Sequence, residues 1–137
     1  MKIPSDTKYI RSISCEVEKF LRSKKIDESD IFDIRLCIEE ALKNAIIHGN
    51  KLNKEFYVFI SYALKGNEFV VEIEDEGVGY APAEVPDPTK EENLLGSGGR
   101  GVLLINKLMD QIKHNEKGNK IIMTKYINNH KGGNNAN

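Results

Sequence analysis

Three polar side chains recur at four-residue steps in one predicted helix: Glu40, Asn44 and His48. Residues four apart share a helix face, so these side chains form a polar column. The amide oxygen of Asn44 suits Mg²⁺, which prefers few protein oxygens together with phosphates and waters. A carboxylate one turn away could orient or deprotonate a hydroxyl that attacks a phosphate. The residues alone leave open that this is a solvated face and Asn44 is incidental.

An acid ends a predicted strand on its apolar face. Alternation places Asp75 on the same side as Val71 and Ile73. A buried carboxylate needs a partner, and a ligand donor such as an adenine amino group would satisfy it selectively. Gly77 and Gly79 follow and let the backbone approach a ligand closely. The alternative is an ordinary turn that begins at a strand-end acid.

A second glycine cluster occupies residues 96–101 and precedes an apolar helix predicted over 100–109. Helix N-termini present unpaired N–H groups and a positive dipole end, which suit phosphate oxygens. Neither a Walker sequence nor a Rossmann unit surrounds the cluster. A flexible linker ahead of a helix is the other interpretation.

These segments need a scaffold of two long helices and two hairpins. The first helix runs to about residue 24, with Ser5 and Asp6 as N-cap candidates, and Gly49-Asn50 ends the second. Strand patterns cover 55–64, 68–75, 110–114 and 120–127. The order predicts an α+β fold with helices on one sheet face. Residues 80–99 form a long irregular segment, which is typical of a functional or disordered loop.

The composition is that of an ordinary globular domain. The chain has 137 residues and a net charge of −1, so one domain over 1–127 is expected, followed by a disordered Asn- and Gly-rich tail over 128–137. No basic block favours nucleic-acid binding. Cys15 and Cys37 fit buried thiols of a reduced protein. Without a signal peptide or a membrane-length apolar run, we expect a cytoplasmic protein.

In this order the three segments resemble the N-box and the two glycine boxes of the GHKL ATPase superfamily, which includes histidine kinases and DNA gyrase. Residues 39–49, 74–79 and 99–101 with 108–110 are more narrowly similar to the anti-sigma factor serine kinases. The resemblance covers nearly all of 1–127. It implies the Bergerat fold, a two-layer sandwich of helices on a mixed, mostly antiparallel sheet, with a lid over the nucleotide.

The resemblance also implies a role for each matching residue. Glu40 would be the base for a substrate serine, and Asn44 would bind Mg²⁺. The residues implied at ATP are Asn44, Asp75, Gly77, Gly79, Gly98, Gly99, Arg100, Gly101 and Thr124, the last beside adenine. His48 would be structural. Arg11 falls roughly where the family has a partner-contacting arginine.

As a family member, the chain would bind Mg-ATP, phosphorylate a serine of an anti-anti-sigma (STAS-type) protein and sequester a sigma factor as a homodimer, with no direct contact to nucleic acid or membrane. One departure is that Gly96, not an arginine, precedes Ser97-Gly98. A positive group near the γ-phosphate matters greatly in phosphoryl transfer. An ATP-binding module that sequesters a partner without phosphotransfer is therefore the alternative. A fragment of a sensor histidine kinase is disfavoured, because no phosphoacceptor hairpin precedes the domain.

Overall fold

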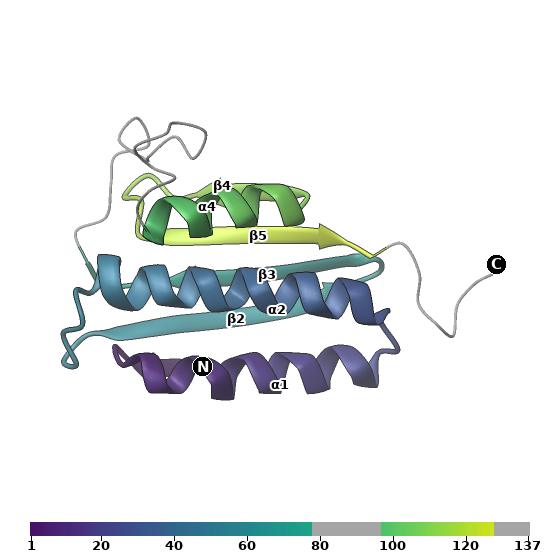
Figure 1. Ribbon diagram of the computed structural model, residues 1–137, viewed down its shortest axis with the longest axis horizontal. Helices are drawn as coiled ribbons and strands as arrows, with labels where there is room; N and C mark the ends of the chain where they lie inside the picture. Colours follow the sequence, from purple (N-terminus) through teal and green to yellow (C-terminus); the bar gives the residue numbers. More distant parts are fainter. Residues whose placement is uncertain (78–96, 128–137) are drawn as a thin grey trace.

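The computed structural model describes residues 1–77 and 97–127, and for residues 97–102 it describes the backbone alone. Within these ranges the chain forms two layers (Figure 1), with α1 (Ile10–Ser23), α2 (Glu28–Lys43) and α4 (Ser97–Leu108) lying on one face of a sheet. None of the helices in these ranges is both long and apolar enough to span a membrane. The α+β prediction, with helices on one face, is confirmed.

The sheet contains β1 (Lys2–Pro4), β2 (Tyr57–Lys65), β3 (Glu68–Glu74), β4 (Gln111–His114) and β5 (Lys120–Tyr126). Its strand order is β1-β2-β3-β5-β4, and each neighbouring pair is antiparallel. Among the described strands the sheet is thus antiparallel rather than mixed. Both predicted hairpins form, and their register brings the end of β3 beside the start of β5.

Strand β1 was not predicted. Ile3 lies opposite Val58 of β2 and is 6% exposed. A strand of three residues that ends in proline has too little alternation to detect, and proline is tolerated here because β1 is an edge strand. The chain then turns into a 3-10 segment, η1 (Thr7–Tyr9), whose N-cap is Asp6. Ser5, the other predicted cap, is instead fully buried.

The core lies between the helices and the sheet. The alternation predicted for β3 is observed, since Phe69, Val71 and Ile73 are at most 1% exposed on the helix side. They meet the apolar face of α2, where Ile34 and Ile38 are fully buried. Each such side chain stabilises the fold by about 1.5–3 kcal/mol relative to exposure. Burial on this scale fixes the strand register, and with it the position of the residue after β3.

The end of α2 changes helical type. From Asn44 to Gly49 the chain forms a π-helical turn, η2, after which the Asn50 N–H donates to the Ala45 carbonyl at 2.8 Å. Gly49, which was expected to end the helix, does not have a positive φ. The left-handed residues are instead Lys51 and Leu52, with φ of 53° and 60°. The helix therefore stops where predicted but through a wider turn, a geometry common at functional sites.

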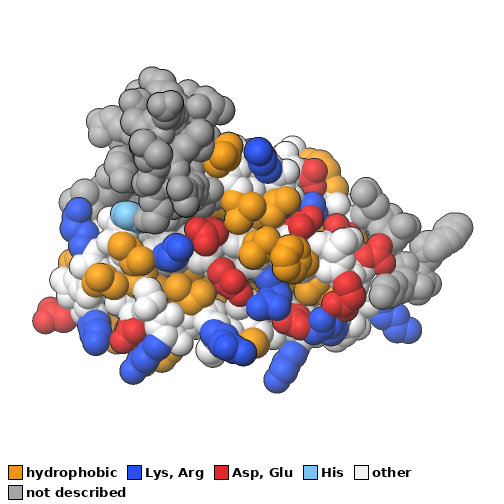
Figure 2. Space-filling model, viewed as in Figure 1, with side chains coloured by type: hydrophobic (Ala, Val, Ile, Leu, Met, Phe, Trp, Pro, Cys, Tyr) orange, Lys and Arg blue, Asp and Glu red, His pale blue; other side chains and the backbone are white. Residues whose placement is uncertain are grey.

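The helix side of the molecule presents a mixed surface. Figure 2 shows Lys and Arg interspersed with Asp and Glu, with hydrophobic side chains reaching the surface between them. The most exposed large hydrophobic side chain of the described part is Phe32 on α2, at 59%. This face therefore does not carry a field of one sign.

Candidate functional site

The predicted segments meet at one end of the molecule. Figure 1 shows the C-terminal end of α2, the C-terminal end of β3 and the N-terminal end of α4 on the same side. Helix α4 packs against α2 and also contacts η2. The polar column, the strand-end acid and the start of the glycine-containing helix therefore surround one region.

Asp75 lies immediately after β3 and is 9% exposed. Its Oδ1 accepts a hydrogen bond from the Gly77 N–H at 2.8 Å. Within residues 1–77 and 97–127, no other donor reaches this carboxylate, so Oδ2 lacks a protein partner there. Burial raises the pKa of the Asp75 carboxyl, against the opposing effects of the Gly77 N–H and the Lys117 charge. The side chain is an acceptor held ready for a ligand donor.

Two glycines make room for this carboxylate. A Cβ on Gly49 would overlap the Asp75 carboxylate, and a Cβ on Gly77 would overlap the Gly49 carbonyl. Neither glycine has a positive φ. Space rather than backbone freedom therefore requires glycine at both positions, and Gly49 joins the site as a residue that the sequence pattern did not reveal.

Asn44 begins η2 with an unusual environment. Its Oδ1 is buried and has no hydrogen-bond partner in the described part of the chain. Buried polar atoms are rarely left unsatisfied, and such exceptions point to an absent water, ion or ligand. An amide oxygen is a ligand that Mg²⁺ accepts. Since the described residues include no cluster of three or more His, Cys, Asp or Glu, an ion here would take its other ligands from phosphate and water.

The two adjacent acids of α2 are used differently. Glu39 is engaged from α1 by the fully buried Ser14, which donates to its Oε2 at 2.5 Å, and from its own helix by Arg35, which donates to the same atom at 3.2 Å. The side chain of Glu40 is 24% exposed, and among the described residues its one ion pair is with the Lys43 ammonium, at 3.5 Å. Glu40 is therefore the acid whose carboxylate is less occupied by protein hydrogen bonds within that part of the chain.

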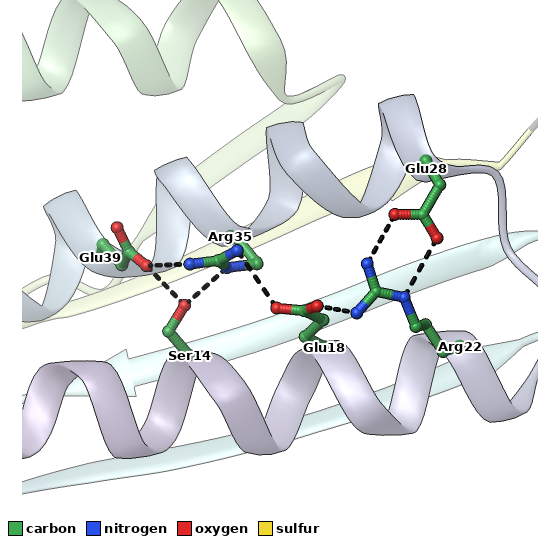
Figure 3. Close-up of polar contacts among 6 residues, drawn as sticks. All are labelled: Ser14, Glu18, Arg22, Glu28, Arg35 and Glu39. Carbon is green, nitrogen blue, oxygen red and sulfur yellow. Dashed lines mark hydrogen bonds and ion pairs between the residues drawn. The ribbon is translucent and has the colours of Figure 1, made fainter.

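A ladder of alternating charges binds α1 to α2 (Figure 3). Arg35 contacts Glu18 at 3.1 Å, Glu18 contacts Arg22, and Arg22 pairs with both oxygens of Glu28. Single exposed pairs of this kind contribute at most about 1 kcal/mol each. A connected ladder ending on a buried serine fixes the two helices against one another, and thus the rotation of α2 that presents Glu40 and Asn44.

The second glycine cluster is more helical than predicted. Helix α4 begins at Ser97 rather than at 100, so Gly98, Gly99, Arg100 and Gly101 form its first turn. Packing of the helix's apolar side, where Ile105 is 1% exposed, stabilises a start made of weak helix formers. The unpaired N–H groups of the helix therefore belong to the cluster itself. The side chain of Arg100 and the residues Gly79 and Gly96 lie outside what the structure describes.

The structure does not bring Thr124 to Asp75. Thr124 lies opposite Val70 in the register of β3 and β5, on the face away from the helices and from Asp75. It also lies four pairs along the strand from the Glu74–Lys120 pair. The residue beside Asp75 is Asn119, which is 8% exposed and exchanges hydrogen bonds with the Asp75 backbone. Antiparallel pairing of the two strands could have identified Asn119 from the sequence, because the residue before β5 must lie opposite the residue after β3.

Four further residues were singled out in the sequence. His48 in η2 and Arg11 in α1 are exposed. Cys15 and Cys37 are both free thiols, and Cys37 is buried as predicted whereas Cys15 is half-buried.

A fold of helices on one antiparallel sheet face, with Asn44 and Asp75 at the same end, is that of an ATPase domain. Residues 3–125 match the family model of the histidine kinase-like ATPase domain, and the chain belongs to this family. The match confirms the resemblance predicted from the three motifs.

Relatives and solved structures agree with this assignment. The serine-protein kinase RsbW of Staphylococcus aureus (strain JH9) is 28% identical over 135 residues, which cover 93% of this chain and 85% of the relative. A crystal structure of the RsbU and RsbW domains of Rv1364c from Mycobacterium tuberculosis is similar with a TM-score of 0.62 at 20% identity. That likeness covers 93% of this chain but only 32% of the solved one. The histidine kinase domain of Erythrobacter litoralis EL346 is similar with a TM-score of 0.54 at 20% identity, over 91% of this chain and 61% of that one. These two structures support the fold.

Proposed function

We propose that this chain is a Mg-ATP-dependent serine kinase that phosphorylates an anti-anti-sigma protein and sequesters a sigma factor. The observation that carries the proposal is the pairing of two acceptors at one end of the fold. Within the described residues Asn44 Oδ1 is buried without a partner, and the Asp75 carboxylate accepts from one donor, the Gly77 N–H. An adenine nucleotide with its metal ion would supply a cation for the first acceptor and a hydrogen-bond donor for the second.

The two ends of the site would bind different parts of ATP. Asp75, whose carboxylate fits against Gly49 and Gly77 because neither carries a side chain, would accept a hydrogen bond from the adenine amino group. Asn44 would hold Mg²⁺, which when bound neutralises phosphate charge. The N–H groups of the first turn of α4, from Gly98 to Gly101, would lie along the phosphates. Gly79 would help to shape the adenine pocket.

Glu40 would act as the general base. The serine hydroxyl oxygen forms its bond to the γ-phosphorus while the bond to the ADP oxygen breaks, and the hydroxyl proton passes to the Glu40 carboxylate. Glu40 lies four residues before Asn44 and so shares its helix face. The weak Lys43 contact leaves this carboxylate free to accept a proton.

The partners follow from the RsbW relatives and the earlier resemblance. We propose an anti-anti-sigma protein as phosphoacceptor, a sigma factor as the sequestered protein, a homodimer as the working form and the cytoplasm as the location. Arg11, exposed on α1, is a candidate for partner contact.

The two adjacent acids provide a matched test. Glu40→Gln is expected to bind ATP normally and to lower phosphotransfer at least about a hundredfold, within the range for loss of a general base. Glu39→Gln removes a charge one residue away, in the ladder with Ser14 and Arg35, and should keep phosphotransfer. Transfer of radiolabelled phosphate from ATP to the cognate anti-anti-sigma protein is the measurement. Full activity of Glu40→Gln would remove Glu40 from the role of base.

A second candidate is sequestration without phosphotransfer. It is motivated by Gly96, which stands where the resembled kinases carry an arginine before Ser-Gly. In that case ATP binding would change the affinity for the partner, yet no labelled phosphate would reach any co-purified protein. Robust phosphorylation of such a partner excludes this candidate.

A further inference from the structure

Asn50 is a buried polar residue to which no role in the site has yet been assigned. It follows η2 directly, six residues after Asn44, and is 2% exposed. A polar side chain buried to this degree must find partners for both its carbonyl oxygen and its amino group. Those partners connect segments that are far apart in the chain.

The Asn50 amide satisfies all these requirements. Its Oδ1 accepts from the Glu76 N–H at 2.8 Å, and its Nδ2 donates to Ser5 Oγ at 2.8 Å and to the Tyr57 carbonyl at 3.0 Å. Ser5, itself fully buried, donates onward to the Phe56 carbonyl at 2.8 Å. Only a side chain with one acceptor and two donors in a fixed plane can make this set, and asparagine is the smallest that does.

The bond to Glu76 crosses the candidate site. Glu76 lies between Asp75 and Gly77, whereas Asn50 ends the helical segment that begins with Asn44. The neighbouring Gly49 abuts the Asp75 carboxylate and leaves no room for a side chain. One amide therefore joins the loop proposed to bind adenine to the helical segment whose first residue, Asn44, is proposed to hold Mg²⁺.

We infer that Asn50 is a positioning residue that sets the separation between Asp75 and Asn44, and so makes one ATP site out of two half-sites. The inference rests on the proposed function. A ligand that spans both ends gains affinity when they are held at the correct distance, because less ordering is needed on binding. A ligand that occupies one end does not depend on that distance.

The test compares two ligands in two variants. ATP with Mg²⁺ reaches both ends, and adenosine reaches only the Asp75 end. Asn50→Ala is expected to lower ATP affinity about tenfold, equivalent to one lost hydrogen bond, and adenosine affinity by less than about twofold. Ser5→Ala is the control, since it removes a partner of Asn50 on the far side and leaves the bond to Glu76. Titration calorimetry with both ligands on the wild type and the two variants gives six affinities, and urea unfolding gives the stabilities.

Several outcomes would overturn the inference. Equal losses for ATP and adenosine would mean that Asn50 only shapes the base pocket, and equal ATP losses in Asn50→Ala and Ser5→Ala would mean a general effect of stability. Asn50→Ser is too short to reach Glu76, so it should show the same ATP-specific loss and serves where Asn50→Ala does not fold. Failure of the wild type to bind ATP would instead refute the proposed function.

Discussion

Asn119 and Asp75 hold each other by a reciprocal pair of hydrogen bonds: the Asp75 N–H donates to the Asn119 carbonyl at 2.9 Å, and Asn119 Nδ2 donates to the Asp75 carbonyl at 2.6 Å. Both bonds use the backbone of Asp75, and the carboxylate is left for other donors. Asn115 in turn donates to Asn119 Oδ1 at 2.8 Å and so fixes the amide orientation. The adenine acceptor of the proposed site is thus anchored by the neighbouring strand.

Asn119→Ala should weaken ATP binding through this anchor. Loss of the Nδ2 bond is expected to lower stability by about 1 kcal/mol and ATP affinity several-fold, because the Asp75 backbone is released on one side. Urea unfolding and ATP titration measure the two effects. Thr124→Val is the control: it changes β5 on the opposite sheet face and should leave ATP affinity unchanged. A selective loss of ATP binding in Thr124→Val would contradict the register argument.

Asp75→Asn should separate stability from binding. Burial is the main cause that raises the pKa of Asp75 in the folded protein above its value in the unfolded chain. The wild type therefore loses stability as the pH rises from below the unfolded-state pKa to above the folded-state pKa. Asparagine is neutral throughout, so the variant should be more stable than the ligand-free wild type near pH 7, with the difference vanishing below about pH 4. Adenine affinity should fall about tenfold or more, as for a lost bond to a charged group. Denaturant titrations of the wild type and the variant near pH 7 and below pH 4 measure the difference in their free energies of unfolding. If this difference is the same at both pH values, the buried-carboxylate explanation is contradicted.

Gly49→Ala should disrupt the site by overpacking. The added methyl would overlap the Asp75 carboxylate, so the free energy of unfolding should fall by about 1–3 kcal/mol and ATP binding should be lost. Gly66→Ala is the matched control, because Gly66 has open space around it but a φ of 61°. It should lower stability by about 1 kcal/mol, the usual effect of removing glycine from this conformation, and keep ATP affinity. If Gly49→Ala binds ATP as well as Gly66→Ala does, the close approach has no functional role.

Cys37 should react only when the protein opens. Its side chain is fully buried in α2, and burial raises the pKa of the Cys37 thiol to about 12. Because the thiolate is the reactive form, alkylation near pH 8 should be negligible in the native state and should follow the unfolding transition in urea. A Cys15→Ser background isolates the signal. Rapid native-state labelling of Cys37 would show that α2 opens locally.

Sequence patterns predicted the parts of the fold that follow from periodicity. The alternation of β3 placed Asp75 correctly on the core side. The four-residue spacing of Glu40 and Asn44 predicts a shared helix face, and both residues lie in the helical segment formed by α2 and η2. The roles of Asn50 and Asn119 in the site were missed, since both depend on hydrogen-bond partners that are distant in the sequence and no local pattern marks them.

Errors arose where local signals were weak or misleading. Ser5 and Asp6 both suit an N-cap, and only long-range burial beside β2 separates them. The glycines suggested that the loop ends at residue 99 and that the helix begins at Arg100, but the helix α4 begins at Ser97, and its packing stabilises this earlier start. A threonine in the last strand was assigned to adenine by resemblance, although the register turns it to the other face.

Because of the π-helical turn, the geometry of this site depends on the number of residues between Asn44 and Asn50. Each residue of an α-helix advances the chain by about 100°, and η2 contains the wider spacing in which Asn50 bonds to Ala45. Deleting one residue between Asn44 and Asn50 would return the segment to ordinary helical phase and rotate the Asn50 amide away from Glu76. Homologues with one residue fewer in this interval would therefore need a different link between the helix and the loop after β3.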